Sequence, residues 1–300
     1  MLSGGVGGAR LARGLAAVPG VDLTVIVNVG DDEQVYGLNI SPDLDTVVYT
    51  LAGVEGPEGW GRSHDRFRVM HHLAGFEVDT SFRLGDADLA TNLFRTARLA
   101  EGWPLSRITE AVAGAFGLTA RILPATDDNL RTQLLTADGW RTFQDYFVLR
   151  RHTDDVLDIR FVGASESSPA PGVLEALAAT EAVIIGPSNP VLSIWPILAI
   201  PELSEALEAA GRVLAVSPLF AGRALKGPAD RVLAGFGYAS GNRGVIEAYG
   251  GLITDFVLDV GDAEEANTLT GLVRSIQAVP TRISSPEAAL RLGEFVIGLL

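Results

Sequence analysis

The first fifteen residues contain a pattern that favours phosphate binding. Gly4, Gly5, Gly7 and Gly8 lie within five positions, and residues 9–15 have the apolar spacing of a helix. A glycine-rich turn that opens a helix presents unpaired backbone N–H groups and the positive end of the helix dipole to an anion. Glycine would be needed because a phosphate must approach the backbone where a side chain would clash. We therefore predict a phosphate-binding loop; a tight turn without a ligand is the simpler alternative.

This loop fits neither standard phosphate-binding motif. In the dinucleotide pattern G-x-G-x-x-G, the segment Gly5-Val6-Gly7 supplies the first half, but Arg10 occupies the third glycine position. The pattern G-x-x-x-x-G-K-[ST] is absent because no Lys follows the glycines. The loop by itself therefore predicts a phosphate ligand of unspecified identity.

Amide and acidic side chains follow a predicted buried strand at residues 21–29. Asn28, Asp31 and Asp32 lie at its end, and ligands of open α/β sheets bind outside the carboxyl ends of the strands. Asp31 also lies roughly 20 residues beyond the glycines, where a dinucleotide fold keeps its ribose-binding acid. This spacing leaves a nicotinamide-dependent oxidoreductase as an alternative function.

Two more acids, Asp43 and Asp45, precede a helix that we predict from about Val47, with Asp45 or Thr46 as its cap. Carboxylate oxygens suit Mg²⁺, so these acids together with the Asp31 pair favour a metal site. A purely structural N-cap is the alternative role for Asp45.

Composition excludes several classes of partner. The 300 residues are 47% hydrophobic and carry a net charge of −14, which argues against nucleic acid and anionic membranes as partners. The absence of Cys excludes a thiolate nucleophile or thiolate metal site. There is no apolar signal segment at the start, and the longest apolar run, 191–200, is too short to span a bilayer. We therefore expect a soluble, cytoplasmic protein.

The predicted elements that position these residues alternate between apolar strands and amphipathic helices. This rhythm is typical of a doubly wound, mainly parallel, Rossmann-like α/β sheet. We assign residues 1–80 and 156–300 to this nucleotide-binding core. Residues 81–155 are predicted to be an inserted subdomain over the active site, made of helices and a small antiparallel piece with a turn at 137–139. Polar loops end three core strands, at 28–32, 186–189 and 217–226, so we expect them at one edge of the sheet.

Asp86 and Asp88 begin one of the predicted helices of the insert. Acidic residues in a first turn interact favourably with the helix dipole, so a structural role is as consistent as a binding role. Ser188 and Asn189 are suited to contact a nucleobase or ribose, and an Asx-type turn that caps the following helix is the alternative.

Several segments together resemble the 2-phospho-L-lactate transferase family, CofD with its actinobacterial relative FbiA. The resemblance covers nearly the whole chain, and D-L-D-T-V followed by G-P-S-N-P makes it specific. The segments are S-G-G-V-G-G-A-R (3–10), N-V-G-D-D (28–32), S-P-D-L-D-T-V-V-Y-T-L-A-G (41–53), G-D-A-D-L-A-T (85–91), G-P-S-N-P-V-L-S-I (186–194), I-L-A-I-P (197–201) and S-P-L-F-A-G-R-A-L-K-G-P-A-D (217–230).

The resemblance implies a phosphotransferase of coenzyme F-420 biosynthesis that requires Mg²⁺. Such an enzyme joins Fo, 7,8-didemethyl-8-hydroxy-5-deazariboflavin, to a phospholactyl or phosphoenolpyruvyl group from a guanosine-diphosphate donor and releases GMP. Relatives suggest a homodimer. The implied catalytic residue is Asp45, and the implied metal ligands are Asp45 and Asp31. The implied binding residues are Ser3, Gly4, Gly5, Val6, Gly7, Gly8, Arg10, Asn28, Asp31, Asp43, Asp86, Asp88, Pro187, Ser188, Asn189, Arg223 and Lys226.

The residue types agree with this chemistry. Phosphoryl transfer needs positioning and charge neutralisation rather than a covalent nucleophile, and the chain has neither Cys nor a G-x-S-x-G elbow. We expect in-line attack by the terminal ribityl hydroxyl of Fo on the β-phosphorus, with Asp45 holding Mg²⁺ and accepting the hydroxyl proton.

One departure from the family pattern concerns the segment G-D-A-D. The family commonly has Gly-Asp-Arg-Asp, whereas this chain has Ala87, so Arg83 or Arg62 is expected to substitute for the missing cation. A non-catalytic nucleotide-sugar-binding regulator of the same superfamily is a further alternative function.

Overall fold

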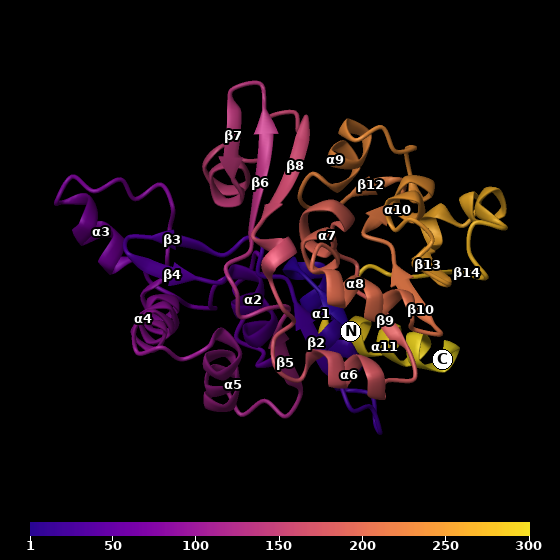
Figure 1. Ribbon diagram of the computed structural model, residues 1–300, viewed down its shortest axis with the longest axis horizontal. Helices are drawn as coiled ribbons and strands as arrows, with labels where there is room; N and C mark the ends of the chain where they lie inside the picture. Colours follow the sequence, from indigo (N-terminus) through magenta and orange to yellow (C-terminus); the bar gives the residue numbers. More distant parts are fainter.

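The computed structural model describes all 300 residues and contains a seven-stranded parallel sheet at its centre (Figure 1). Its strand order is β14-β13-β10-β9-β1-β2-β5, with every neighbouring pair parallel. The order reverses between β1 and β9, which is the topological switch point where doubly wound sheets bind ligands. This confirms the predicted fold class. The strands are β1 (Leu2–Ser3), β2 (Thr24–Val27), β5 (Arg121–Pro124), β9 (Val183–Ile185), β10 (Val213–Val216), β13 (Asp255–Asp259) and β14 (Ser275–Val279).

The central strands are apolar because helices cover both faces of the sheet. All four residues of β10, Val-Leu-Ala-Val, are buried, although alternate side chains of a strand point to opposite faces. One group of helices contains α1 (Gly5–Ala16), α2 (Pro42–Leu51) and α11 (Pro286–Leu299), and α1 contacts the other two. A second group contains α6 (Val173–Ala179), α7 (Trp195–Leu198) and α8 (Pro201–Glu208), and α8 contacts the other two.

A smaller cluster of elements lies beyond the β5 edge, at the left of Figure 1. It comprises the hairpin β3–β4 and the helices α3 and α4, whereas α5 packs on β5 and its buried apolar residues belong to the main core. Ile40, Met70, Leu84 and Leu89 form the small buried core of this cluster. The bounds are β3 (Glu33–Val35), β4 (Leu38–Ile40), α3 (Arg68–Ala74), α4 (Asp86–Ala100) and α5 (Leu105–Ala115).

A three-stranded antiparallel sheet, β7-β6-β8, lies at the top of Figure 1. Its strands are β6 (Arg131–Thr136), β7 (Gly139–Thr142) and β8 (Asp158–Val162), and a π-helical turn occupies Asp145–Leu149. The remaining elements are β11 (Leu219–Phe220), β12 (Arg223–Ala224), α9 (Ala229–Gly235), α10 (Asn242–Ala248) and the π-helical turn Pro190–Ile194; short 3-10 turns lie at Ala164–Glu166, Val260–Asp262 and Glu265–Leu269.

The structure corrects the limits of the predicted insert, 81–155. Strand β5 pairs with β2 in the central sheet, whereas β8, assigned to the core from the sequence, pairs with β6 in the small sheet. The pattern of β8, Asp-Ile-Arg-Phe-Val, alternates half-buried and exposed positions, which is typical of a one-sided antiparallel strand.

The first turn of α2 lies earlier than predicted. The helix begins at Pro42 after the N-cap position Ser41, because proline is well tolerated at the first helical position. Asp43 and Asp45 therefore lie in its first turn rather than before it. The second strand of the hairpin is also corrected. The sequence predicts it at Thr142–Leu149, whereas β7 ends at Thr142 and residues 143–149 are helical.

None of the individual helices combines the length and the apolar composition needed to cross a membrane, whereas one bent pair, Pro190–Leu198 with Pro201–Glu208, reaches both limits by length and composition alone.

Candidate active site

A cleft of about 1370 Å³ opens at the switch point of the sheet. The glycine loop, the segment 187–193, the first turns of α2 and α4, and the loop 56–62 border it. It gathers most of the predicted site residues: Gly4, Gly5, Val6, Gly7, Arg10, Asp31, Asp43, Asp45, Asp88, Pro187, Ser188, Asn189 and Lys226. Ser3, Gly8, Asn28, Asp86 and Arg223 do not line it.

The glycines of the loop are needed mainly by contacts within the chain. A Cβ on Gly7 would lie 2.1 Å from the Pro187 carbonyl oxygen, one on Gly4 would lie 2.5 Å from Ser193 Cβ, and one on Gly8 would lie 2.3 Å from Ser3 Oγ. Only Gly5 is required by conformation, because its φ is +64°. Packing within the chain therefore already requires Gly4, Gly7 and Gly8, and close approach of a phosphate to the loop stays a prediction.

This packing gives a testable expectation. Gly7→Ala is expected to lower the free energy of unfolding by about 3 kcal/mol, because backbone must move to admit the methyl group. Gly5→Ala, which meets only conformational strain, is expected to cost about 1 kcal/mol. Urea unfolding measures both changes. Gly114→Ala, in the open interior of α5, is the control and should not destabilise the protein; equal effects of Gly7→Ala and Gly114→Ala would contradict the close packing of Gly7 against Pro187.

The first amides of α1 divide into two that are occupied and two that are free. Gly4 N donates to Ser188 Oγ at 3.2 Å, and Gly5 N donates to Asp43 Oδ1 at 2.6 Å. The amides of Val6 and Gly7 have no hydrogen-bond partner in the protein and line the cleft. These two are first-turn donors that a helix leaves unpaired, so the loop retains two free amides for an anion.

Asn28 joins two carboxylates beside this loop. Its Nδ2 donates to Asp43 Oδ2 at 3.0 Å and to Asp31 Oδ1 at 3.3 Å, and its Oδ1 accepts from Gly30 N at 2.8 Å. Burial and the charge of Asp43 raise the pKa of Asp31 well above its ordinary value. Burial likewise raises the pKa of Asp43 to about 6. Because two buried carboxylates lie side by side, binding of a proton or a metal cation between them is favourable.

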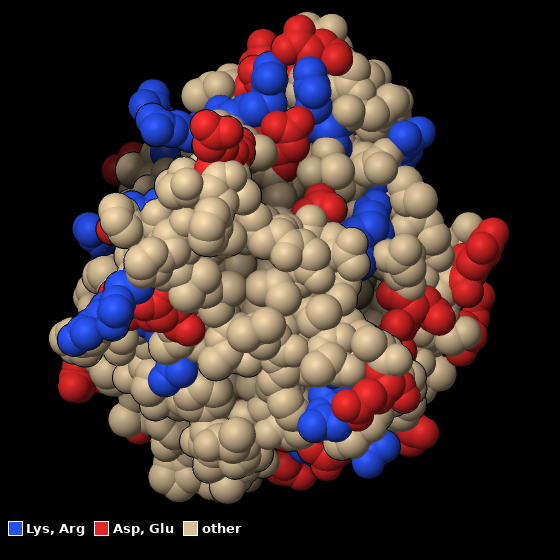
Figure 2. Space-filling view, turned by 90° about the vertical axis from the view of Figure 1, so that its left-hand side faces the viewer, with Lys and Arg blue, Asp and Glu red and all other residues tan.

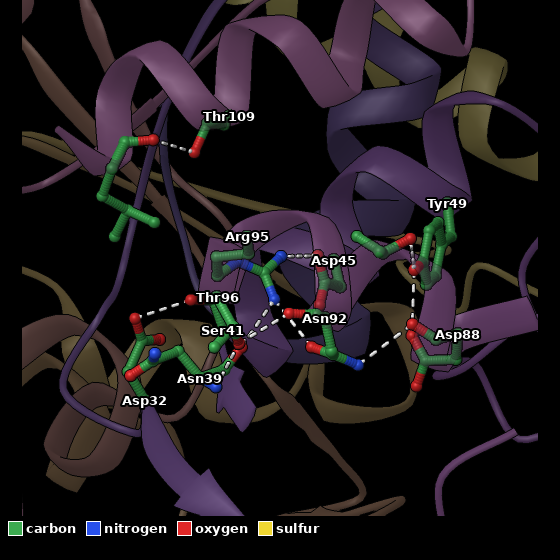
Figure 3. Close-up of polar contacts among 12 residues, drawn as sticks. Asp32, Asn39, Ser41, Asp45, Tyr49, Asp88, Asn92, Arg95, Thr96 and Thr109 are labelled. Carbon is green, nitrogen blue, oxygen red and sulfur yellow. Dashed lines mark hydrogen bonds and ion pairs between the residues drawn. The ribbon is translucent and has the colours of Figure 1, made fainter. Parts of the chain in front are cut away.

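Asp45 belongs to a different network, centred on the buried Arg95 (Figure 3). Arg95 Nη2 donates to Asp45 Oδ1, and its Nη1 donates to Asn92 Oδ1 at 2.7 Å and to the Asn39 carbonyl at 3.3 Å. The Arg95 side chain is 3% exposed and that of Asp45 10%. Burial raises the pKa of Asp45, and Arg95 opposes that shift.

Sequence reasoning missed Arg95, although α4 carries a signal for it. The buried residues of this helix are Leu89, Thr91, Asn92 and Arg95, so polar side chains occupy the face that packs inward. Polar residues at core-facing positions of an amphipathic helix indicate a buried network.

Asp88 and Tyr49 form a third contact, between α4 and α2. The Tyr49 hydroxyl donates to Asp88 Oδ1 at 2.9 Å and lies 2.7 Å from Thr91 Oγ1 (Figure 3). Burial, followed by the charge of Asp45, raises the pKa of Asp88 to about 6. Asp86, in contrast, accepts from the amides of Arg68 and Val69 at 3.2 and 3.0 Å and supports α3 outside the cleft.

The raised pKa of Asp88 predicts a pH-dependent stability. An ordinary Asp has a pKa of 3.8, so between pH 4 and 6 the folded protein binds this proton more tightly than the unfolded chain. The stability from protonated Asp88 is present below about pH 4 and is lost as the pH rises through 6. Between pH 4 and pH 7, wild type should lose about 2 kcal/mol of unfolding free energy that Asp88→Asn does not lose. Urea unfolding across this range measures it, and parallel curves would contradict the shift.

The segment after β9 has the structural role that the sequence left as an alternative. Asn189 Oδ1 accepts from Val191 N at 3.0 Å and from Leu192 N at 3.1 Å, an Asx-type cap. Ser188 Oγ donates to the Gly4 carbonyl at 2.7 Å. Both residues therefore fix the glycine loop, and both still line the cleft.

The basic residues predicted to bind the ligand have separate environments. Arg10 Nη1 donates to the Ile283 carbonyl at 3.2 Å. Lys226 Nζ pairs with Glu58 Oε2 at 2.8 Å and lies 5.4 Å from the centre of the Trp60 ring, so it links two loops that border the cleft.

The two predicted metal ligands, Asp31 and Asp45, belong to separate hydrogen-bond networks. Asp31 lies beside Asp43, whereas the charge of Asp45 is matched by Arg95. No three His, Asp or Glu side chains converge with the geometry of a metal site. The oxygen donors of Asp31 and Asp43, whose charges lack a cationic partner within 4 Å, fit a divalent ion better than Asp45 does.

Comparisons with known proteins place this cleft in a family context. The family model described as 2-phospho-L-lactate transferase CofD matches residues 1–279. A phosphoenolpyruvate transferase of Streptomyces griseus is 40% identical, covering 100% of this chain and 97% of the relative. A 2-phospho-L-lactate transferase of Methanosarcina acetivorans is 37% identical, covering 100% and 98%. These findings confirm the resemblance and favour a transferase over an oxidoreductase.

A solved structure shares the fold. The crystal structure of a UPF0052 family protein from Bacillus halodurans matches with a TM-score of 0.64 and 18% identity, covering 99% of this chain and 97% of that chain. At this identity the match supports the architecture alone.

Proposed function

Because the chain belongs to the 2-phospho-L-lactate transferase family CofD, we propose that its substrates are a guanosine-diphosphate-linked donor and the deazaflavin Fo. The enzyme transfers the phospholactyl or phosphoenolpyruvyl group to Fo and releases GMP, as a step of coenzyme F-420 biosynthesis. One observation supports this most strongly. Two unpaired helix N-terminal amides, Val6 and Gly7, lie in the same cleft as the buried carboxylates Asp31, Asp43 and Asp45.

The donor diphosphate is assigned to the free amides of Val6 and Gly7. They lie at the amino end of α1, where the helix dipole favours an anion. Asp43 already accepts from the neighbouring Gly5 amide, so a diphosphate beside it would meet a negative charge. This repulsion is removed when a cation lies between the two.

Mg²⁺ fits this position, with Asp31 and Asp43 as its ligands from the chain. Both are carboxylates, which Mg²⁺ prefers, and Asn28 fixes them side by side. A bound Mg²⁺ would neutralise the charge of the diphosphate and of the developing transition state.

Asp45 is proposed to accept the proton of the attacking hydroxyl. One of its oxygens pairs with Arg95, and the other has no hydrogen-bond partner in the protein. The terminal ribityl oxygen of Fo forms a bond to the β-phosphorus while the bond from the β-phosphorus to the bridging oxygen breaks. The proton passes to Asp45, and GMP leaves with the bridging oxygen.

The tricyclic ring of Fo is assigned to the aromatic side of the cleft. The aromatic residues that line the cleft include Trp60, Phe67, Phe82, Phe143 and Phe147. The last two rings stack at 5.2 Å. Flat aromatic ligands bind such walls through offset stacking and apolar burial.

The assay for this function supplies Fo, Mg²⁺ and each guanosine-diphosphate-linked donor, and detects GMP and the phosphodiester product by mass. We expect both products in equal amounts and only when all components are present. Uridine-diphosphate sugars and NADH serve as alternative ligands. Tight binding of a uridine sugar without any transfer would indicate a regulator instead, and NADH binding without a response to GDP would indicate an oxidoreductase.

We also propose a homodimer, through the end of the molecule that carries α3 and α4. Uncharged side chains cover most of that face (Figure 2), and apolar residues are exposed on it. Phe76, which follows α3, is 77% exposed, and Val69 on α3 and Leu93 on α4 are also exposed. Apolar patches of this kind are typical of protein interfaces. Light scattering should give twice the chain mass of 31.6 kDa; a monomeric mass across the micromolar range would exclude this dimer.

A further inference from the structure

Arg62 is a half-buried cation in the cleft wall without an ionic partner. None of the ion pairs of the protein involves it. Its guanidinium lies 5.3 Å from the centre of the Phe116 ring and 5.9 Å from that of Tyr49. Aromatic faces hold a guanidinium in place while leaving its N–H groups available. Arg62 is therefore positioned to bind an anion that the protein itself does not supply.

The loop that carries Arg62 is fixed by its own backbone. Ser63 N donates to the Val54 carbonyl at 2.8 Å, and Gly56 N donates to the Gly61 carbonyl at 2.9 Å. Gly59 of the same loop packs against the Val6 side chain, since a Cβ on it would lie 2.4 Å from Val6 Cγ1. The loop thus connects the amides of the glycine loop to Arg62, and little ordering is required when an anion binds.

The other cleft arginines are less suited to this role. Arg10 is already bonded to a backbone carbonyl, and the remaining ones extend into solvent: Arg83, Arg151 and Arg282. Arg83 and Arg62 are the two candidates to replace the basic residue that the family has where this chain has Ala87, and their environments differ. Arg83 is exposed and lies over Phe67 at 4.1 Å, whereas Arg62 lies over Tyr49, which contacts Asp88.

The position along α2 indicates which anion Arg62 would bind. Asp43 contacts the Gly5 amide, and Tyr49 lies six residues further, about 9 Å along the helix axis at 1.5 Å per residue. A donor whose diphosphate is bound at the glycine loop can therefore direct its transferred group along α2 towards Arg62. The groups named for the relatives, phosphoenolpyruvate and 2-phospho-L-lactate, both carry a carboxylate on the carbon that bears the phosphoester oxygen.

We infer that Arg62 binds the carboxylate of the transferred three-carbon group and thereby selects the donor; this inference rests on the proposed function. The neighbouring side chains on α2 and α4, Asp45 and Asp88, are acidic and would repel that carboxylate. A guanidinium offers two parallel N–H donors to a carboxylate, which a lysine cannot reproduce.

The test compares wild type and Arg62→Gln by calorimetric binding of two guanosine ligands, GDP and the full donor. The variant should bind the donor about 30-fold more weakly and GDP as tightly as wild type does. Arg62→Lys should recover only part of the loss. In steady-state kinetics the donor KM should rise with kcat nearly unchanged, because the carboxylate does not react.

A third ligand distinguishes the carboxylate from the phosphates. An isopropyl diphosphate ester of guanosine has the shape of the lactyl donor without its carboxylate. Wild type should bind it about as weakly as Arg62→Gln binds the full donor, and Arg62→Gln should not weaken it further. Arg107→Gln is the matched control, because Arg107 lies 3.6 Å over the Trp103 ring outside the cleft.

Two results would overturn the inference. Equal weakening of GDP and donor in Arg62→Gln would assign Arg62 to the diphosphate, and unchanged donor binding would remove it from recognition. Failure of the proposed function gives a different outcome, namely no transfer to Fo by wild type. Circular dichroism and thermal melts of each variant show that it is folded.

Discussion

Replacing Asp43 by Asn is expected to lower the turnover of the transferase by about 10³-fold at saturating substrates. The substitution keeps an oxygen to accept from the Gly5 amide but removes the charge that we assign to cation binding. GMP release measured over a range of Mg²⁺ concentrations checks this, and the residual activity should need more Mg²⁺ than wild type does.

The same substitution should not destabilise the protein at neutral pH. Burial raises the pKa of Asp43, so its ionised form is costly in the folded state, and a neutral side chain removes that cost. Asp127→Asn is the control. Asp127 also accepts from a helix N-terminal amide, that of Ser106 at 2.6 Å, but lies outside the cleft. Wild-type rates in Asp43→Asn would exclude Asp43 from catalysis.

Replacing Arg95 by Met is expected to lower the free energy of unfolding by about 3–5 kcal/mol. Arg95 is the buried cation that pairs with Asp45, so its loss leaves an uncompensated carboxylate in the interior. Urea unfolding at pH 7 measures the change.

A second substitution tests the cause of that loss. Adding Asp45→Leu to Arg95→Met removes the unpaired charge and should restore part of the stability, because the two residues act as a pair. If the effects of the two substitutions simply add, or if Arg95→Met is as stable as wild type, the pairing is not a significant source of stability.

The sheet was predictable because its signal is local and repeated. Apolar runs such as 213–216 alternate with helical segments, and helices on both faces require that pattern. The assignment of β8 failed because its alternating residues satisfy either sheet, and only the pairing with β6 decides between them.

The sequence predicted which residues belong to the candidate site better than it predicted which residues contact one another there. Side chains at the carboxyl ends of parallel strands meet at one edge, so Asp31 and the glycine loop were expected together. Their partners depend on long-range packing, as in the pairing of Asp45 with Arg95 across α2 and α4. The contact of Gly7 with Pro187 joins residues 180 positions apart in the chain, so a glycine needed for packing looks like a glycine needed for phosphate.

The most direct test of the proposed donor site is a crystal structure with GDP and Mg²⁺ bound. We expect the diphosphate oxygens within hydrogen-bond distance of the Val6 and Gly7 amides, with the ion between the diphosphate and the carboxylates of Asp31 and Asp43. GDP bound elsewhere, with those two amides left without a ligand, would contradict the proposed role of the amino end of α1.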